Sequence, residues 1–249
     1  MLVLQVKKSV KKRLDNMQLL EDPRFEAEVM RHLRNPRGES HNHLLAMVAE
    51  HEDGEFHYLV SEFCRFGEFF DFVQGRGAIP EERSRKYFMQ LVDALDYMHE
   101  SGYCHLDMSL ENVLMFSEDD LKICDFGMSR RLEGEGIFPA CGSNMPGKVS
   151  YRAPEIQARK PFSGRSCDIF SLGVMLFMML TGLPPFERTD DTDPRFKYVY
   201  EGRLGDLVVR WNLQNKVPEV VLDLLKQMMC PPQLRISLAN IKKHPWLRR

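Results

Sequence analysis

The spacing of apolar residues divides the chain into a strand-rich beginning and a helix-rich remainder. The segment Val3–Lys8 is predicted as a β-strand, and Pro23–Leu33 has apolar residues at helical spacing. Two more strands are predicted at Leu44–Ala49 and Phe56–Glu62, on either side of an Asp-Gly turn. From there to the end of the chain the pattern is mainly helical.

Two helices stand out in the second part of the chain. A long amphipathic helix is predicted after Pro80, because apolar residues recur on one face and two glutamates stand near its start. The most apolar stretch, Ile169–Leu180, is too short to span a bilayer and contains Ser171 and Gly173. It is predicted to be a buried core helix.

Composition narrows the classes of partner. The net charge of −2 gives no general affinity for nucleic acid or membrane surfaces, so neither is expected as a partner. The basic run Lys7–Arg13 is interpreted as a strand end followed by a solvated loop. Six scattered cysteines without a C-x-x-C pair indicate reduced thiols, so an intracellular, cytoplasmic protein is expected.

Three short motifs occur in an order that points to phosphoryl transfer. This chemistry needs one carboxylate to orient a hydroxyl, and an Asn/Asp pair to hold magnesium. Together the motifs place these groups on two adjacent turns, each after a short apolar strand. The motifs are His105-Leu106-Asp107 with Asn112, Asp125-Phe126-Gly127, and Ala153-Pro154-Glu155.

At these motifs the chain resembles the eukaryotic protein kinase family, from about residue 3 to Trp246. The resemblance implies an α+β, two-lobed fold, with a truncated N-terminal β-lobe at residues 1–63 and a mainly helical C-lobe at residues 64–249. It also implies a protein serine/threonine kinase that transfers the γ-phosphate of Mg-ATP to a protein hydroxyl. The ending His244-Pro245-Trp246-Leu247 looks most like the calcium/calmodulin-dependent branch.

The resemblance assigns roles around the catalytic turns. Asp107 would accept or orient the substrate hydroxyl, Asn112 and Asp125 would bind Mg²⁺, and Phe126 would set the active or inactive state. Two further roles would be structural. Asp168 would anchor the backbone of the catalytic loop, and Glu155 would pair with Arg235 inside the helical lobe.

In the smaller lobe the resemblance implies a lysine that holds the α- and β-phosphates and a helix glutamate that pairs with it. Glu26 matches the glutamate, whereas Glu28 is interpreted as a solvent-facing charge. Lys7 fits the lysine, being preceded by Leu4-Gln5-Val6. Lys8 is a rival, because the alternation of a strand places it on the same face as Leu4 and Val6.

The remaining ATP-site positions lie in or just after residues 59–64, which resemble the hinge between the lobes. Glu62 and Cys64 would contact adenine through backbone groups, with Ser61 as a small gatekeeper. Glu68 matches an acidic residue near the ribose. In family members that prefer basic substrates, Glu68, Glu111 and Glu201 coincide with positions that receive substrate arginines. A protein substrate with basic residues near its Ser or Thr is therefore expected.

The chain departs from the family pattern at three places. No G-x-G-x-x-G occurs, so the chain is expected either to be truncated or to work without the phosphate-covering loop. Leu106 replaces the arginine that usually reads a phosphate in the activation segment. Ser109 replaces the lysine that usually neutralises the transferred phosphoryl group.

Lys148 is a candidate to compensate for Ser109. It stands in Gly147-Lys148-Val149-Ser150-Tyr151, where the family has a threonine that reaches back toward the catalytic aspartate. The alternative is a surface lysine in a flexible loop. The chief alternative function is a pseudokinase scaffold with weak or no turnover. A small-molecule phosphotransferase is disfavoured, because the resemblance assigns Ala153-Pro154-Glu155 and the Arg235 segment to protein-substrate kinases. Tyrosine specificity is disfavoured, because no Ala-Ala-Arg or Arg-Ala-Ala follows Asp107.

Overall fold

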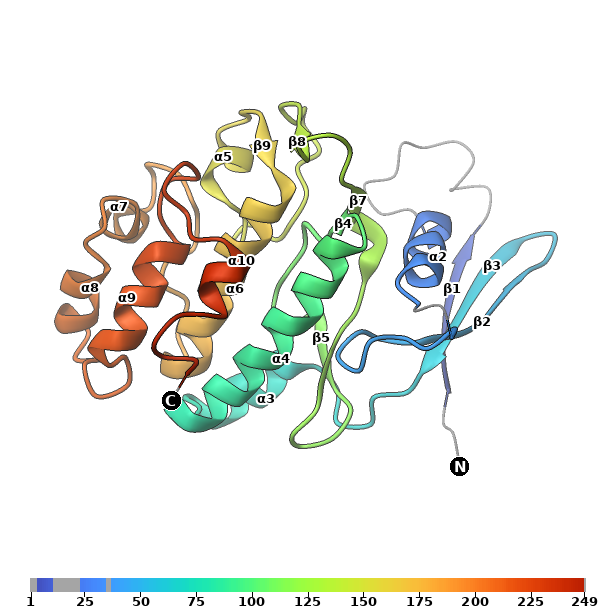
Figure 1. Cartoon of the computed structure of the whole chain (residues 1–249), viewed down its shortest axis with the longest axis horizontal. Helices are drawn as coiled ribbons and strands as arrows, with labels where there is room; N and C mark the ends of the chain where they lie inside the picture. Colours follow the sequence, from blue (N-terminus) through green and yellow to red (C-terminus); the bar gives the residue numbers. More distant parts are fainter. Residues whose placement is uncertain (1–3, 11–22, 35–36, 249) are drawn as a thin grey trace.

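The computed structural model describes residues 4–10, 23–34 and 37–248. Figure 1 shows a small sheet with one helix at one end of the molecule and a large helical part at the other. The sheet has the antiparallel order β1-β3-β2 and is formed by β1 (Leu4–Val10), β2 (Met47–Glu52) and β3 (Phe56–Glu62). Helix α2 (Pro23–His32) contacts β2 and β3. The lobe boundary proposed at residues 63 and 64 stays a prediction.

The second predicted strand was wrong at its beginning. β2 begins at Met47 rather than Leu44, because the preceding residues pair with the helical part of the molecule. The backbone N–H of Leu45 donates to the Ile123 carbonyl at 2.9 Å, and the N–H of Ile123 donates to the His43 carbonyl at 2.9 Å. Leu44 is 1% exposed at this junction, so its apolar character reflects burial between the two parts.

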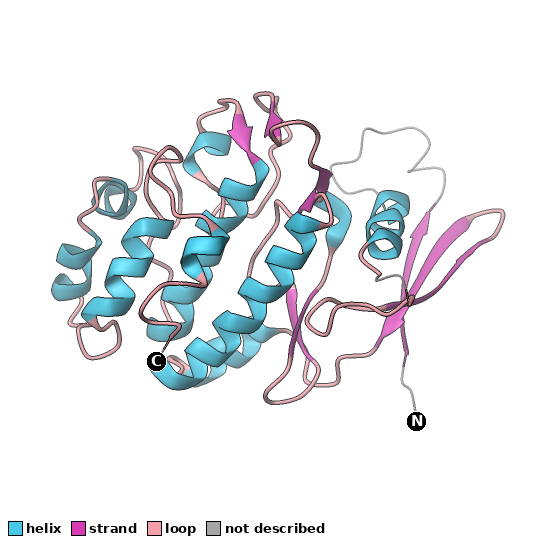
Figure 2. Ribbon diagram, in the orientation of Figure 1, coloured by secondary structure: helices cyan, strands magenta, loops and turns pink. Residues whose placement is uncertain are grey.

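The helical part is built around two long helices, as the sequence predicts. α6 (Gly164–Thr181) contacts α4 (Glu81–Glu100) and α9 (Glu219–Met228), and Figure 2 shows how few strands lie among these helices. Among residues 4–10, 23–34 and 37–248, α6 is the one helix long and apolar enough to cross a membrane, and 89% of it is buried inside the molecule. The helices are α3 (Phe69–Arg76), α4 (Glu81–Glu100), α5 (Pro154–Gln157), α6 (Gly164–Thr181), α7 (Pro194–Tyr200), α8 (Leu204–Arg210), α9 (Glu219–Met228) and α10 (Leu238–Ile241).

Short antiparallel pairs position the turns that carry the motifs. The catalytic loop, residues 105–112, connects β4 (Tyr103–Cys104) to β5 (Val113–Met115). Asp125 directly follows Cys124 after β6 (Leu121–Ile123), before the 3₁₀ turn Phe126–Met128. A turn fixed at both ends by hydrogen-bonded strands presents its side chains in a defined direction. The pairs are β4 (Tyr103–Cys104) with β7 (Arg130–Arg131), β5 (Val113–Met115) with β6 (Leu121–Ile123), and β8 (Ile137–Phe138) with β9 (Phe162–Ser163).

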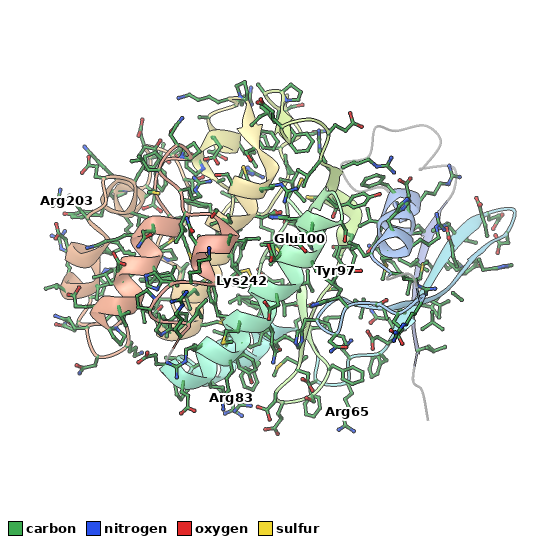
Figure 3. The ribbon with its side chains drawn as sticks, viewed as in Figure 1. Arg65, Arg83, Tyr97, Glu100, Arg203 and Lys242 are labelled. Atoms are coloured by element: carbon green, nitrogen blue, oxygen red, sulfur yellow. The ribbon has the colours of Figure 1, made fainter. Side chains whose placement is uncertain are left out.

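The C-terminal segment is fastened to α4. Lys242 lies against this helix (Figure 3), with its Nζ 2.6 Å from Asp96 Oδ2 and 3.1 Å from Asp93 Oδ1. Trp246 is fully buried, and its indole N–H donates to Glu81 Oε1 at 2.9 Å. The C-terminal segment that contains Trp246 is therefore part of the core that supports α4.

The predicted pair of Glu155 and Arg235 forms in the interior of the helical part. Two parallel contacts join the side chains, at 2.6 Å (Nη1 to Oε1) and 3.1 Å (Nη2 to Oε2). Both side chains are at most 4% exposed. A bidentate buried pair of this kind fixes geometry, and removing one partner would leave an uncompensated charge. The pair therefore holds α5 against the loop that follows α9. α5 comes directly after the activation segment, which is the stretch between Gly127 and Ala153.

Candidate active site

Asp168 shapes the backbone of the catalytic loop. The carboxylate is fully buried and accepts the backbone N–H of His105 at 2.9 Å and that of Leu106 at 2.7 Å. His99 Nε2 lies 2.8 Å from the same carboxylate. These contacts hold Leu106 at φ 63°, a conformation that costs a non-glycine residue energy and that is met where surrounding contacts impose it. The loop thereby turns Asp107 toward the site.

Asp107 is held by two neighbours from different segments. Its side chain is 5% exposed. The amide Nδ2 of Asn112 donates to Asp107 Oδ2 at 2.6 Å, and the backbone N–H of Lys148 donates to Oδ1 at 3.0 Å. A carboxylate fixed at both oxygens is pre-oriented, which suits a group that must accept a proton from a bound hydroxyl.

The structure brings Lys148 and Ser109 together. Lys148 Nζ donates to Ser109 Oγ at 2.9 Å and to Asn112 Oδ1 at 2.9 Å, and it lies 3.6 Å from Asp107 Oδ2. The side chain is 37% exposed and points into the catalytic loop rather than into solvent. The positive charge that Ser109 lacks is thus present beside it, although its catalytic role stays a prediction.

Two residues that the sequence analysis did not single out hold the Lys148 loop. Gly147 has φ 82°, and a Cβ there would lie 3.0 Å from the Leu106 carbonyl oxygen, so glycine permits the close approach of the two loops. Arg152 donates to the backbone carbonyls of Pro146 and Gly147, at 3.0 and 2.5 Å. In a single sequence an arginine with this task resembles any other arginine.

Asp125 and Glu26 meet at Lys7. Lys7 Nζ lies 2.8 Å from Glu26 Oε2 and 3.3 Å from Asp125 Oδ1. Burial opposes protonation of the lysine, but the two carboxylates outweigh it and hold the pKa of Lys7 well above its usual value. Phe126 is 1% exposed against the ring of His105, and its turn contacts α2. This arrangement assembles the predicted lysine, glutamate and aspartate.

Lys8 does not face this group. Its Nζ lies 3.6 Å from the centre of the Phe56 ring, a cation–π contact on the opposite face of β1. The face that carries Leu4 and Val6 is not buried, since these residues are 43% and 56% exposed. The burial argument for Lys8 was therefore wrong, and Lys7 is the lysine that lines the cavity.

Exchanging each lysine for methionine separates the two. Lys7→Met is expected to weaken binding of an ATP analogue about tenfold or more, because a charge-assisted contact to phosphate is lost. Lys8→Met serves as the matched control and is expected to leave the affinity unchanged. Calorimetric titration measures both dissociation constants, and a larger loss in the Lys8 variant would reverse the assignment.

A cavity of about 250 Å³ lies between the sheet and the catalytic turns. The polar side chains that line it include Lys7, Glu26, Asn112 and Asp125. Apolar side chains also line it, and such a combination of apolar surface with a few convergent charges is typical of a small-molecule site. The apolar residues are Met30, Leu45, Leu59 and Leu114.

The hinge positions divide into those that line this cavity and those whose side chains are used elsewhere. Ser61 and Glu68 line it. Glu62 binds Lys122 at 2.9 Å and accepts the backbone N–H of Ala46 at 2.8 Å. Burial raises the pKa of the Cys64 thiol to about 11. The adenine contacts of Glu62 and Cys64 concern backbone groups and stay predictions.

The acidic positions for substrate arginines are not all in one place. Glu68 and Glu111 line the cavity, and Glu111 also lines a second cavity beside Tyr151. Glu201 lies at the end of α7, 3.6 Å from Arg203. Glu28 is 2.6 Å from Arg131 and so has a partner other than Lys7.

The donor set suits a magnesium ion bound together with nucleotide. Mg²⁺ takes oxygen ligands and usually needs one or two protein groups, with phosphates and waters completing its shell. Asp125 presents to the cavity a carboxylate that is already in contact with Lys7. Asn112 is on the same wall, but its oxygen accepts the Lys148 ammonium. Asp125 therefore fits the ion, and the metal role of Asn112 stays a prediction.

Comparison with known proteins identifies the family. The protein kinase domain matches residues 3–247, which is nearly the whole chain. The chain belongs to the protein kinase family. The α+β architecture and the assembled lysine, glutamate and aspartates agree with this membership.

Individual relatives are protein kinases from several organisms. Calcium/calmodulin-dependent protein kinase type 1 of Caenorhabditis briggsae is 30% identical over 226 residues, which cover 89% of this chain and 59% of that protein. Its namesake from Macrobrachium nipponense is 33% identical, with 89% and 61% covered. The SNF1-related protein kinase catalytic subunit alpha KIN12 of Arabidopsis thaliana is 32% identical, with 89% and 42% covered. The chain thus spans less than two thirds of each of these relatives.

Proposed function

We propose that this protein kinase domain transfers the γ-phosphate of Mg-ATP to a serine or threonine hydroxyl of a protein. The observation that carries the proposal is the contact of Lys7 with both Glu26 and Asp125 on the wall of the cavity. This contact joins the phosphate-binding lysine, its helix glutamate and the metal-binding aspartate, which phosphoryl transfer requires together. The relatives named as protein kinases support the same activity.

The proposed reaction uses Asp107 as the group that receives the proton. The substrate hydroxyl oxygen forms a bond to the γ-phosphorus as the bond from this phosphorus to the β,γ-bridging oxygen breaks. The hydroxyl proton passes to the Asp107 carboxylate, and ADP leaves with the bond electrons. Asn112 and the Lys148 backbone keep the carboxylate oriented throughout.

Charge on the phosphates is met from two sides of the site. Asp125 would hold a magnesium ion, which would supply positive charge to neutralise phosphate oxygens. Lys7 would contact the α- and β-phosphates, held in place by Glu26 at 2.8 Å. Lys148 would stabilise the transferred group beside Asp107, because a fixed ammonium in a partly buried site needs no rearrangement as charge develops.

The other functions are less well supported. A pseudokinase scaffold is not favoured, because the aspartates and the lysine are all in place. A small-molecule phosphotransferase is disfavoured by Glu155 and its buried pair with Arg235, which belong to the protein-substrate kinases. Tyrosine specificity is disfavoured, because the Ala-Ala-Arg or Arg-Ala-Ala signature is absent after Asp107.

Transfer of radiolabelled phosphate to a library of Ser-, Thr- and Tyr-containing peptides tests the proposal. Mg²⁺-dependent label is expected on serine or threonine, and Asp107→Asn is expected to remove it. The same library tests the proposed preference for basic residues, for which Glu68 and Glu111 are the supporting acids. Label on tyrosine alone, or none with any peptide, would contradict the proposal.

Activity is expected to be independent of phosphate in the activation segment. Leu106 is 4% exposed and apolar, whereas an arginine at this position would form bidentate hydrogen bonds with a phosphate. Phosphatase treatment should therefore leave the transfer rate unchanged. A large drop, with the lost phosphate mapped between Gly127 and Ala153, would contradict this expectation.

An intracellular location is part of the proposal. All six cysteines are free thiols, which supports a reducing compartment. Burial raises the pKa of the Cys124 thiol far above its usual value, so this cysteine in the wall of the cavity stays protonated. Fractionation of cells that express the tagged protein tests the location.

A further inference from the structure

The orientation of Asn112 is fixed by two neighbours of opposite character. Asp107 is a carboxylate that only accepts hydrogen bonds, so the NH₂ group of the amide must face it, at 2.6 Å. Lys148 is an ammonium that only donates, so the amide oxygen must face it, at 2.9 Å. The one atom of Asn112 that could bind a metal ion is therefore in contact with a positive charge.

This ammonium is held firmly at the amide oxygen. Its second hydrogen bond goes to Ser109 Oγ at 2.9 Å, and its third neighbour is Asp107 Oδ2 at 3.6 Å. The backbone of the same residue donates to Asp107 Oδ1 at 3.0 Å. A lysine fixed through both its backbone and its side chain differs from a lysine that swings freely in solvent. Its charge therefore lies inside the site.

A divalent ion and the ammonium would compete for this place. Two cations on one amide oxygen repel each other strongly, and no carboxylate other than Asp107 is recorded within salt-bridge distance of Lys148 in the described part of the chain. Asp125 differs, because a carboxylate has enough lone pairs to accept Lys7 and bind a metal ion at once. Protein kinases ordinarily place two magnesium ions, one at each of these side chains.

We propose that the nucleotide complex of this kinase domain holds one divalent ion, at Asp125, and that the Lys148 ammonium takes the place of the second ion at Asn112. The proposal rests on the proposed function, because it requires nucleotide in the cavity. It makes Lys148 a built-in cation that replaces both the missing lysine at Ser109 and one metal ion. Removing its charge should open the second metal position.

Counting bound Mn²⁺ tests this directly and needs no turnover. The protein is saturated with a non-hydrolysable ATP analogue and titrated with Mn²⁺, and free Mn²⁺ is measured by electron paramagnetic resonance. One bound ion per nucleotide is expected for the unchanged chain and two for Lys148→Met. Lys148→Gln, which keeps much of the length, is a second variant with the same expected count. Lys243→Met, at an exposed lysine elsewhere, should keep one ion.

Each other result has a defined meaning. Two ions in the unchanged chain would overturn the inference and leave the proposed function standing. One ion in both Lys148 variants would also overturn it, because the count would not depend on the ammonium. If Asp125→Asn kept the single ion, the ion would be at another residue and the inference would again fall. Absence of nucleotide-dependent Mn²⁺ binding in every form would refute the proposed function, and the inference with it.

Discussion

Asp125→Asn is expected to abolish the Mg²⁺ dependence of nucleotide binding and to lower the transfer rate at least about 10²- to 10³-fold. The substitution removes the charge of the carboxylate that fits the ion while keeping nearly the same volume. Asp125 follows β6 and Cys124, has φ 61° and lies 3.3 Å from Lys7. Its backbone conformation tolerates asparagine better than most residues. The fold should therefore survive while the metal site is lost.

Calorimetry with and without Mg²⁺ measures the binding part of this prediction. The unchanged chain should bind the ATP analogue more tightly when Mg²⁺ is present, and Asp125→Asn should bind it equally in both conditions. Asp191→Asn makes the same chemical change at an exposed residue and should behave like the unchanged chain. Parental activity in the Asp125 variant would show that another residue holds the metal.

The sequence predicts the elements of this fold best where the pattern is long or the turn chemistry is specific. The helix predicted after Pro80 is α4, and the strand predicted at Phe56–Glu62 has the observed bounds. The predicted start at Leu44 failed because an apolar residue can be buried between two parts of a molecule as well as within a sheet. Spacing alone cannot distinguish these environments.

Period-two alternation likewise could not choose between Lys7 and Lys8. The alternation correctly placed Lys8 on the same face as Leu4 and Val6. It could not show which face of β1 is turned toward the cavity. That choice is made by tertiary contacts, here the helix glutamate Glu26 at 2.8 Å from Lys7. The motif context, which favoured Lys7, proved the better guide than the apolar face.

The candidate site is predictable where a motif fixes the residue, and not where loops only meet in space. Asp107 and Asp125 are found from their motifs. Arg152 holds the Lys148 loop through backbone carbonyls, which leave no trace in a sequence. The contact of Lys148 with Ser109 could be suspected because each departs from the family pattern, but the distance of 2.9 Å required the fold.

Removal of the Lys148 charge is the second change for which we expect a large effect. Lys148→Met should lower kcat by up to about 10³-fold, because a unit charge at about 4 Å contributes roughly 4 kcal/mol at an effective dielectric constant of 20. The KM for ATP should rise far less, since the ammonium lies beside Asp107 rather than with Lys7. Lys243→Met, the same change at an exposed position, should leave kcat unchanged.

The double change Lys148→Thr with Ser109→Lys should recover much of the rate that Lys148→Thr loses, because it returns the pair usual in the family. Ser109→Lys alone should be harmful, since it places a second ammonium where Ser109 Oγ now accepts the first, in a fully buried position. Neighbouring residues that share partners couple by roughly 0.5–3 kcal/mol in a double-mutant cycle. Steady-state kinetics of the four forms measures this coupling. Effects that simply add would show that Lys148 and Ser109 act independently, and Lys148 would then be an ordinary loop lysine that happens to contact the catalytic loop.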